Sequence, residues 1–206
     1  MRIHLVRHGR SAADPSKLAE EWALHEDAAV GANRLRGSGA LPNKAAWFTS
    51  SERKAVETAA LLFPGVCAVL DGIGEAERAA VWLPGDEFEA AVRRSFERPD
   101  QPAVEGWEPL RVTRARVVEA VRSTVTAVTE RAKDLDMVLV GHGTAWTLLV
   151  ADLTGAPADV DAWARMSMPD HCSLDIVSSD ADRLTASIAS GWGAWSQSSA
   201  YSPMCP

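Results

Sequence analysis

A short motif occurs twice in this chain of 206 residues, at positions far apart: residues 5–9 read LVRHG and residues 139–143 read LVGHG. In each copy an apolar run, typical of a buried strand, ends in His-Gly and is followed by a helical pattern. Ligands of open parallel sheets bind at the carboxyl ends of the strands, where loops lead into helices. The repeat therefore predicts that His8 and His142 face one another at that edge of a sheet.

Apolar runs alternate with helical patterns along the rest of the chain. The strand candidates lie at 3–6, 45–48, 66–70, 137–140 and 184–188, and the helical patterns at 55–63, 88–96, 118–132 and 144–153. This alternation predicts an α/β fold, a three-layer sandwich with a mainly parallel central sheet and helices on both faces. Residues 72–133 are mostly helical and poor in strands. We therefore expect a small helical lid there, within one domain that spans residues 1–206.

Composition and charge exclude several classes of protein. Apolar residues make up 47% of the chain and charged residues 24%, as in a globular protein with a full core. The net charge of −7 argues against a nucleic-acid partner. No apolar run reaches the roughly 18 residues of a membrane span, and the first residues lack the apolar stretch of a secretion signal. We expect a cytoplasmic protein that binds neither membrane nor nucleic acid.

The cysteines argue against a metal centre. Cys67, Cys172 and Cys205 are odd in number, widely spaced and without a C-x-x-C pair. A disulfide framework and a cysteine zinc site are both improbable for such a pattern. We expect neither a metal nor a cofactor.

Two arginines stand near the predicted strand ends. Arg7 lies within the first His-Gly motif, and Arg53 lies in the sequence SSERK at 50–54, where another strand runs into a helix. A guanidinium group makes paired hydrogen bonds to phosphate oxygens, and a helix start offers free N–H groups to an anion. Taken singly, each residue also fits a structural role, and Arg53 could pair with Glu57 one turn further on. Taken together, two arginines and two histidines in an acidic chain predict a phosphoryl site.

Three motifs carry a resemblance to a known family. LVRHGRS at 5–11, SSERKxxETA at 50–59 and VLVGHG at 138–143 occur in the family's order. With them, the chain resembles the histidine phosphatase superfamily, the phosphoglycerate-mutase-like group, in its larger branch. The resemblance implies a metal-independent phosphatase in which His8 is the nucleophile and becomes a phosphohistidine. It also implies roles in catalysis or phosphate binding for Arg7, Arg53, His142 and Gly143.

The family also places a glutamate proton donor after the third strand, in a segment of the form L-x-E. Glu75 in Ile73-Gly74-Glu75 fits this form best, and Glu77 is the alternative. The chain departs from the mutase type after R-H-G. Arg10 stands where that type has Glu, and Asp14 stands where it has Asn. An ionised aspartate repels phosphate, so Asp14 is a doubtful phosphate ligand.

The predicted substrate is a small phosphomonoester. A mutase needs a second basic site, and Arg93-Arg94 is the only further basic cluster near a motif, so hydrolysis is favoured. The rivals are a mutase, a protein phosphohistidine phosphatase, a non-catalytic protein that binds phosphorylated ligands, and a repurposed lyase or transferase. A homodimer is possible. The candidates for substrate specificity are Arg10, Ser11, Trp82, Arg93 and His171.

The end of the chain changes character. No charged residue follows Arg183, and Trp192, Trp195 and Tyr201 lie among serines and glycines. The simpler interpretation is a strand followed by a tail that packs through its aromatic residues. The alternative is a tail that covers the active site or joins a partner.

Overall fold

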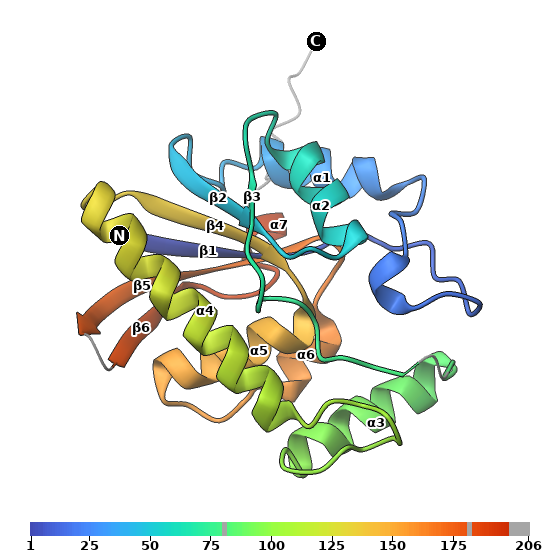
Figure 1. Cartoon of the computed structure of the whole chain (residues 1–206). Helices are drawn as coiled ribbons and strands as arrows, with labels where there is room; N and C mark the ends of the chain where they lie inside the picture. Colours follow the sequence, from blue (N-terminus) through green and yellow to red (C-terminus); the bar gives the residue numbers. More distant parts are fainter. Residues whose placement is uncertain (80–81, 181–182, 198–206) are drawn as a thin grey trace.

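The computed structural model describes residues 1–79, 82–180 and 183–197, and its centre is a six-stranded sheet of order β3-β2-β4-β1-β5-β6 (Figure 1). The first four strands in this order pair in parallel, the fifth pairs antiparallel with the fourth, and the sixth pairs antiparallel with the fifth. In chain order the strands are β1 (Arg2–Arg7), β2 (Ala45–Thr49), β3 (Ala68–Val69), β4 (Asp136–Gly141), β5 (Asp170–Asp180) and β6 (Arg183–Ser190). The predicted α/β class with a mainly parallel sheet is confirmed.

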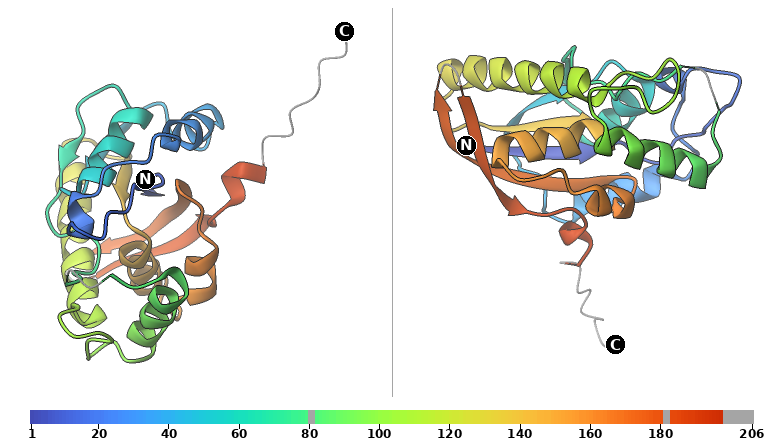
Figure 2. Two further views of the ribbon diagram at one scale, coloured as in Figure 1. Left: turned by 90° about the vertical axis from the view of Figure 1, so that its right-hand side faces the viewer. Right: turned by 90° about the horizontal axis from the view of Figure 1, so that it is seen from below.

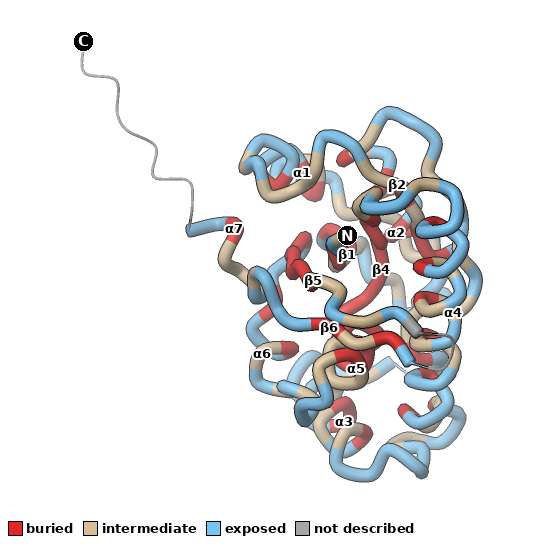
Figure 3. The backbone as a smooth tube through the Cα atoms, turned by 90° about the vertical axis from the view of Figure 1, so that its left-hand side faces the viewer, coloured by how far each residue is buried: buried red, intermediate tan, exposed pale blue. Residues whose placement is uncertain are grey.

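Helices cover both faces of this sheet, because its central strands are apolar on both sides. Val6, Val138 and Val140 pack against α1 (Ala28–Gly37) and α2 (Arg53–Leu62). Ile3, Leu5, Met137 and Leu139 point to the other face, against α4 (Leu110–Arg131) and α5 (Gly143–Thr154). Figures 1 and 2 show the two helical layers with the sheet between them, and Figure 3 shows that buried residues concentrate at its centre. The three-layer sandwich is confirmed.

The predicted helical lid at 72–133 needs a correction. The apolar stripe of α4, formed by Val117, Val121, Val125 and Val128, packs in the main core with the sheet. A helix in that position is a layer of the sandwich, although its Arg116 also lines the cavity described below. By contrast, α3 (Gly85–Glu97) packs through Ala91 and Val92 in a separate small cluster with Trp107 and Trp163. Trp163 belongs to α6 (Val160–Arg165). Within the predicted range, α3 is thus the helix outside the main layers.

Sequence patterns missed β5, which pairs antiparallel with β1. Its sequence DHCSLDIVSSD mixes charged and apolar residues, so no continuous apolar run marks it. The signal that could have identified this strand is the alternation of Cys172, Leu174 and Ile176, which all pack in or against the core. The short helices η1 (Ala19–Glu21), α6 and α7 (Ala194–Gln197), and helix α1, were also missed.

The last described residues pack through an aromatic side chain. Trp195 in α7 is buried with residues of α1, α2 and the sheet, and its indole N–H donates to Asp170 Oδ1 at 2.9 Å. This agrees with the simpler interpretation of the tail up to residue 197, whereas Tyr201 lies outside the described residues. In the described parts of the chain, no helix combines the length and the apolar character needed to cross a membrane.

Candidate active site

The two His-Gly motifs meet at one edge of the sheet. Strands β1 and β4 are adjacent and parallel with Arg7 opposite Gly141, so the residues that follow them leave the sheet side by side. The rings of His8 and His142 lie 5.3 Å apart between centroids and are tilted by 59°. The predicted proximity of the two histidines is therefore confirmed.

His8 is held in one tautomer by its own backbone. Its Nδ1 lies 2.7 Å from the carbonyl oxygen of Gly9, and because a carbonyl only accepts, Nδ1 carries the hydrogen and Nε2 keeps its lone pair. Burial, followed by the neighbouring His142 and Lys54, lowers the pKa of His8 well below 6.5. At neutral pH the ring is uncharged and nucleophilic at Nε2.

His142 lies behind His8 and is fully buried. Its Nε2 lies 2.7 Å from Ser50 Oγ and 3.1 Å from Glu52 Oε1, while its Nδ1 has no hydrogen-bond partner among the described residues. Burial lowers the pKa of His142 to about 4, although the charge of Glu52 opposes this shift. Gly143, the first residue of α5, does not line the cavity described below.

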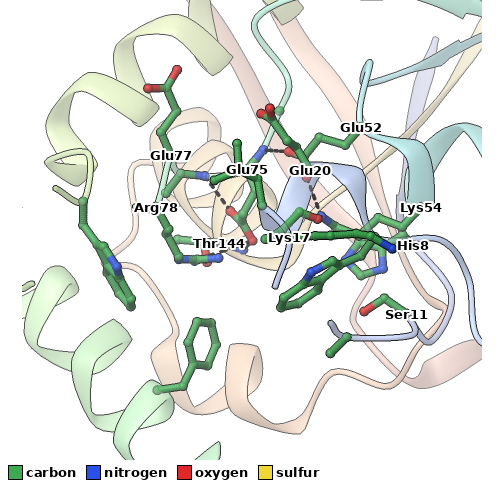
Figure 4. A pocket seen from close by; sticks show the side chains of 18 of the residues that line it. His8, Ser11, Lys17, Glu20, Glu52, Lys54, Glu75, Glu77, Arg78 and Thr144 are labelled. Atoms are coloured by element: carbon green, nitrogen blue, oxygen red, sulfur yellow. Dashed lines mark hydrogen bonds and ion pairs between the residues drawn. The ribbon is translucent and has the colours of Figure 1, made fainter. Parts of the chain in front are cut away.

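A cavity of about 680 Å³ opens beside His8. One wall is the segment at 11–22 that follows β1, and the other is formed by residues 72–79 and 82–88. Arg7, His8, Lys54 and Glu75 line it, and Figure 4 labels the last three. Arg7 donates from Nη1 to the carbonyl of Met166 at 2.7 Å, and within the described residues its buried Nε has no partner. A buried donor without a partner is what a bound phosphate oxygen would satisfy.

Lys54, and not Arg53, is the cation that α2 places at this site. Arg53 is 61% exposed, donates to Glu57 Oε1 at 2.7 Å and does not line the cavity. Its prediction as a phosphate ligand is corrected, because the adjacent helix position points about 100° away. The side chain of Lys54 is 6% exposed, and its Nζ lies 2.5 Å from Glu52 Oε2.

Glu52 is a residue that sequence reasoning missed. Its carboxylate is mostly buried, lines the cavity, contacts both Lys54 and His142 and accepts the backbone N–H of Glu75 at 2.7 Å. Burial raises its pKa, but His142 and Lys54 outweigh that and hold the pKa of Glu52 below 4.5. Its position directly before the helix was the signal that could have found it.

Glu75 lies across the start of α5. Its carboxylate accepts the backbone N–H groups of Ala145 at 3.1 Å and of Thr144 at 3.2 Å, the latter labelled in Figure 4. Burial raises the pKa of Glu75, but Arg78, His142 and the backbone N–H groups of Ala76 and Thr144 outweigh burial and lower the pKa to about 2. The helix start that was predicted to receive a ligand anion is therefore occupied by Glu75 itself. Glu77 also lines the cavity, but it is exposed.

Arg78 is a second cation that the sequence did not single out. Its guanidinium lies over the rings of Phe88 and Trp107, 4.9 and 5.1 Å from their centroids. It donates to Thr144 Oγ1 at 3.2 Å and lies 3.9 Å from Glu75 Oε2. This packing holds a positive charge beside the carboxylate.

The candidates for substrate specificity divide into two groups. Ser11 and Trp82 line the cavity. Three others lie elsewhere, which corrects their prediction: Arg10 pairs with Asp27, Arg93 pairs with Glu89 and Asp161, and His171 bonds to His4 inside the sheet. Each of the three side chains is held by these partners away from the cavity.

Asp14, which was not expected to bind phosphate well, also lies outside the lining of the cavity. It accepts hydrogen bonds from Ser16, pairs with Lys17 at 3.0 Å and does not line the cavity. It therefore does not face a bound phosphate. Among the described residues, no three His, Cys, Asp or Glu side chains gather in a way that could hold a metal ion.

An α/β sandwich with two histidines at one sheet edge, beside buried cations, defines a class of phosphoryl-handling protein. The model of the histidine phosphatase superfamily (branch 1) matches residues 3–188. The chain belongs to this superfamily and is a phosphatase of the histidine type.

Solved structures share this fold at low sequence identity. The mycobacterial glucosyl-3-phosphoglycerate phosphatase is 20% identical with a TM-score of 0.71, covering 92% of this chain and 97% of its own. YhfR of Bacillus stearothermophilus is 19% identical with a TM-score of 0.68, covering 92% and 95%. TTHB049 of Thermus thermophilus is 21% identical with a TM-score of 0.58, covering 85% and 94%. No curated protein matches the chain significantly.

Proposed function

We propose that this protein hydrolyses a small phosphomonoester without a metal ion, through a phosphohistidine on His8. One observation carries the proposal: a neutral imidazole, with its Nδ1 hydrogen committed to the Gly9 carbonyl, lines a cavity beside buried cations. Nucleophilic catalysis needs an unprotonated attacking nitrogen, and the lowered pKa of His8 provides one at neutral pH.

In the first step Nε2 of His8 attacks phosphorus and the bond to the alcohol oxygen breaks. Arg7 and Lys54 hold the phosphate oxygens and neutralise the charge of the transition state. His142 does not line the cavity, and it supports the site from behind His8 through its contacts with Ser50 and Glu52. In the free enzyme the ion pair with Glu52 keeps Lys54 in place. When the phosphate binds, Lys54 gives up part of this contact.

Glu75 is the proton donor to the leaving alcohol. Its pKa of about 2 means that it is ionised before substrate binds. A bound phosphate brings further negative charge close to the carboxylate, which raises its pKa and favours uptake of a proton. In the second step the ionised Glu75 takes a proton from water, the water oxygen attacks phosphorus, and the bond to His8 breaks.

The test is phosphate release from a panel of phosphomonoesters by the wild type and by His8→Ala. We expect the variant to lose about 10⁴-fold or more in turnover with its fold intact by circular dichroism. Turnover should also be unchanged by EDTA. Normal activity of His8→Ala, or inhibition by EDTA that added metal reverses, would overturn the proposal. Transfer of phosphate to a second substrate molecule in place of release would identify a mutase.

A further inference from the structure

Beyond its charged end, the cavity is walled by aromatic side chains. Of the eight tryptophans in the chain, four line it: Trp22, Trp82, Trp107 and Trp163. Phe88 completes this wall. The rings of Trp22 and Trp82 form a tilted pair with centroids 6.0 Å apart. Aromatic side chains bury a large apolar area and favour tilted or offset contacts with other rings.

Part of the apolar lining of the cavity, which includes aliphatic side chains beside the aromatic wall, is exposed to solvent in the free protein. Leu18 is 41% exposed, Trp82 is 49% exposed and Met168 is 42% exposed, and all three line the cavity. Large apolar side chains left in water at a concave site gain free energy when an apolar ligand covers them. The opening of the cavity therefore favours an apolar group on the substrate.

The charges at this end disfavour a second anionic group on the substrate. Lys17 pairs with Asp14 at 3.0 Å, and Arg116 pairs with Glu108 at 2.9 Å and donates to nearby carbonyls. Glu20 and Glu77 line the cavity as well. A carboxylate or second phosphate on the substrate would thus meet Lys17 and Arg116, which already have partners, together with two acidic residues. Arg78, whose Nε has no partner among the described residues, is the exception, and its guanidinium lies beside the carboxylate of Glu75.

A cationic leaving group is disfavoured for a different reason. Aromatic rings attract cations, but three of the five rings of this wall already face cations of the protein. Lys54 Nζ lies 6.0 Å from the centroid of Trp22, and Arg78 lies over Phe88 and Trp107. A positively charged alcohol would be repelled by both.

We propose that the alcohol half of the substrate is a neutral, flat aromatic group, and that Trp82 is a specificity-determining residue for it. This inference rests on the proposed function, because it places the phosphate of the same ester at His8. The aromatic ring would lie between the segment at 11–22 and residues 82–88, in contact with Trp82 and Trp22.

The experiment compares four phosphomonoesters: 2-naphthylmethyl phosphate, glycerol 3-phosphate, 3-phosphoglycerate and phosphocholine. The naphthylmethyl ester has an alkoxide leaving group of ordinary basicity, so a faster reaction reports binding and not a better leaving group. We expect its kcat/KM to exceed each of the others by about tenfold or more, the effect of about 1.4 kcal/mol of added contact. A higher kcat/KM for any of the other three would overturn the inference.

Trp82→Ala tests the residue itself, with Val66→Ala as the control at an apolar position that is 91% exposed outside the cavity. We expect Trp82→Ala to lower kcat/KM for the naphthylmethyl ester about tenfold and that for glycerol 3-phosphate less than about twofold. Val66→Ala should change neither. An equal loss on both esters would overturn the role of Trp82.

Calorimetric binding of 2-naphthylmethylphosphonate, which cannot be hydrolysed, separates this inference from the proposed function. Binding about tenfold tighter than that of methylphosphonate, without phosphate release from any ester, supports the aromatic site and overturns the hydrolysis. Phosphate release from all four esters at similar kcat/KM, without tighter binding of the aryl phosphonate, overturns the aromatic site and leaves the hydrolysis standing.

Discussion

Two pairs of histidines lie in this molecule with the same separation between ring centroids, 5.3 Å, and they differ in everything around them. His4 and His171 are stacked at 23°, and His4 Nδ1 lies 3.0 Å from His171 Nε2 inside the sheet. His8 and His142 are tilted by 59°, and each ring bonds to a different neighbour. The first pair bonds only within itself, and His4 Nε2 and His171 Nδ1 have no other partner among the described residues, whereas His8 of the second pair lines a cavity.

The difference shows that closeness of two imidazoles does not make a site. Both members of the His4–His171 pair are buried, and burial lowers the pKa of each, that of His171 to about 3. The His8–His142 pair has lowered pKa values as well, but Lys54, Glu52 and Glu75 surround it. The charged neighbours and the cavity, not the histidines, separate a chemical role from a structural one.

The largest effect that sharpens this comparison is expected from Glu75→Gln. The amide keeps the shape of the side chain but donates no proton to the leaving alcohol, so kcat should fall about 10³-fold for an alkyl phosphate. The loss should shrink for 4-nitrophenyl phosphate, whose leaving group needs no proton. Steady-state assays on both esters measure it. Equal losses on the two esters would remove Glu75 as proton donor.

Glu52→Gln is the matched control for this variant. Glu52 touches Lys54 and His142 and sits within the same cluster, so we expect a smaller loss, within about tenfold, and no dependence on the leaving group. A loss as large as that of Glu75→Gln, with the same leaving-group dependence, would reassign the proton transfer.

An intermediate effect is expected from Lys54→Met. Loss of one cation at the transferring phosphate should lower kcat/KM about 10²-fold. Arg53→Met at the next position serves as the control, because Arg53 is exposed and outside the cavity, and its activity should stay within about twofold of the wild type. A larger loss of kcat/KM for Arg53→Met than for Lys54→Met would restore the prediction that Arg53 binds phosphate.

The smallest effect concerns the structural pair. Because the pKa of His171 in the folded state lies below that of the unfolded chain, unfolded molecules bind protons first as the pH falls below 6.5. The contribution of His171 to the free energy of unfolding is therefore complete above pH 6.5, and it falls by about 1.4 kcal/mol per pH unit between pH 6.5 and about pH 3.

Urea unfolding of the wild type and of His171→Gln at pH 7, 6 and 5 measures this dependence. In the variant, the slope of the free energy of unfolding against pH should be smaller by the amount that corresponds to about one bound proton. Its turnover at pH 7 should stay within about threefold of the wild type. An unchanged slope would contradict the pH argument, and loss of turnover would break the distinction between the two pairs.

Much of the fold could be predicted because its central strands carry local patterns. β1, β2 and β4 are short apolar runs, and α4 and α5 have helical spacing, with Gly155 in the left-handed conformation ending α5. β5 could not be recognised with the same ease, because its polar residues are satisfied by distant partners. Asp170, for example, accepts hydrogen bonds from the backbone of Gly193 and the indole of Trp195.

The sequence by itself determined that two His-Gly motifs end neighbouring strands and that cations stand nearby, because strands and helix starts depend on local pattern. Only the tertiary structure decided that Lys54 and not Arg53 enters the site, that Glu75 caps α5, and that Arg78 lies over two aromatic rings. A change of one residue along a helix rotates a side chain by about 100°. The neighbours that then fix its charge come from parts of the chain dozens of residues away, which no local pattern encodes.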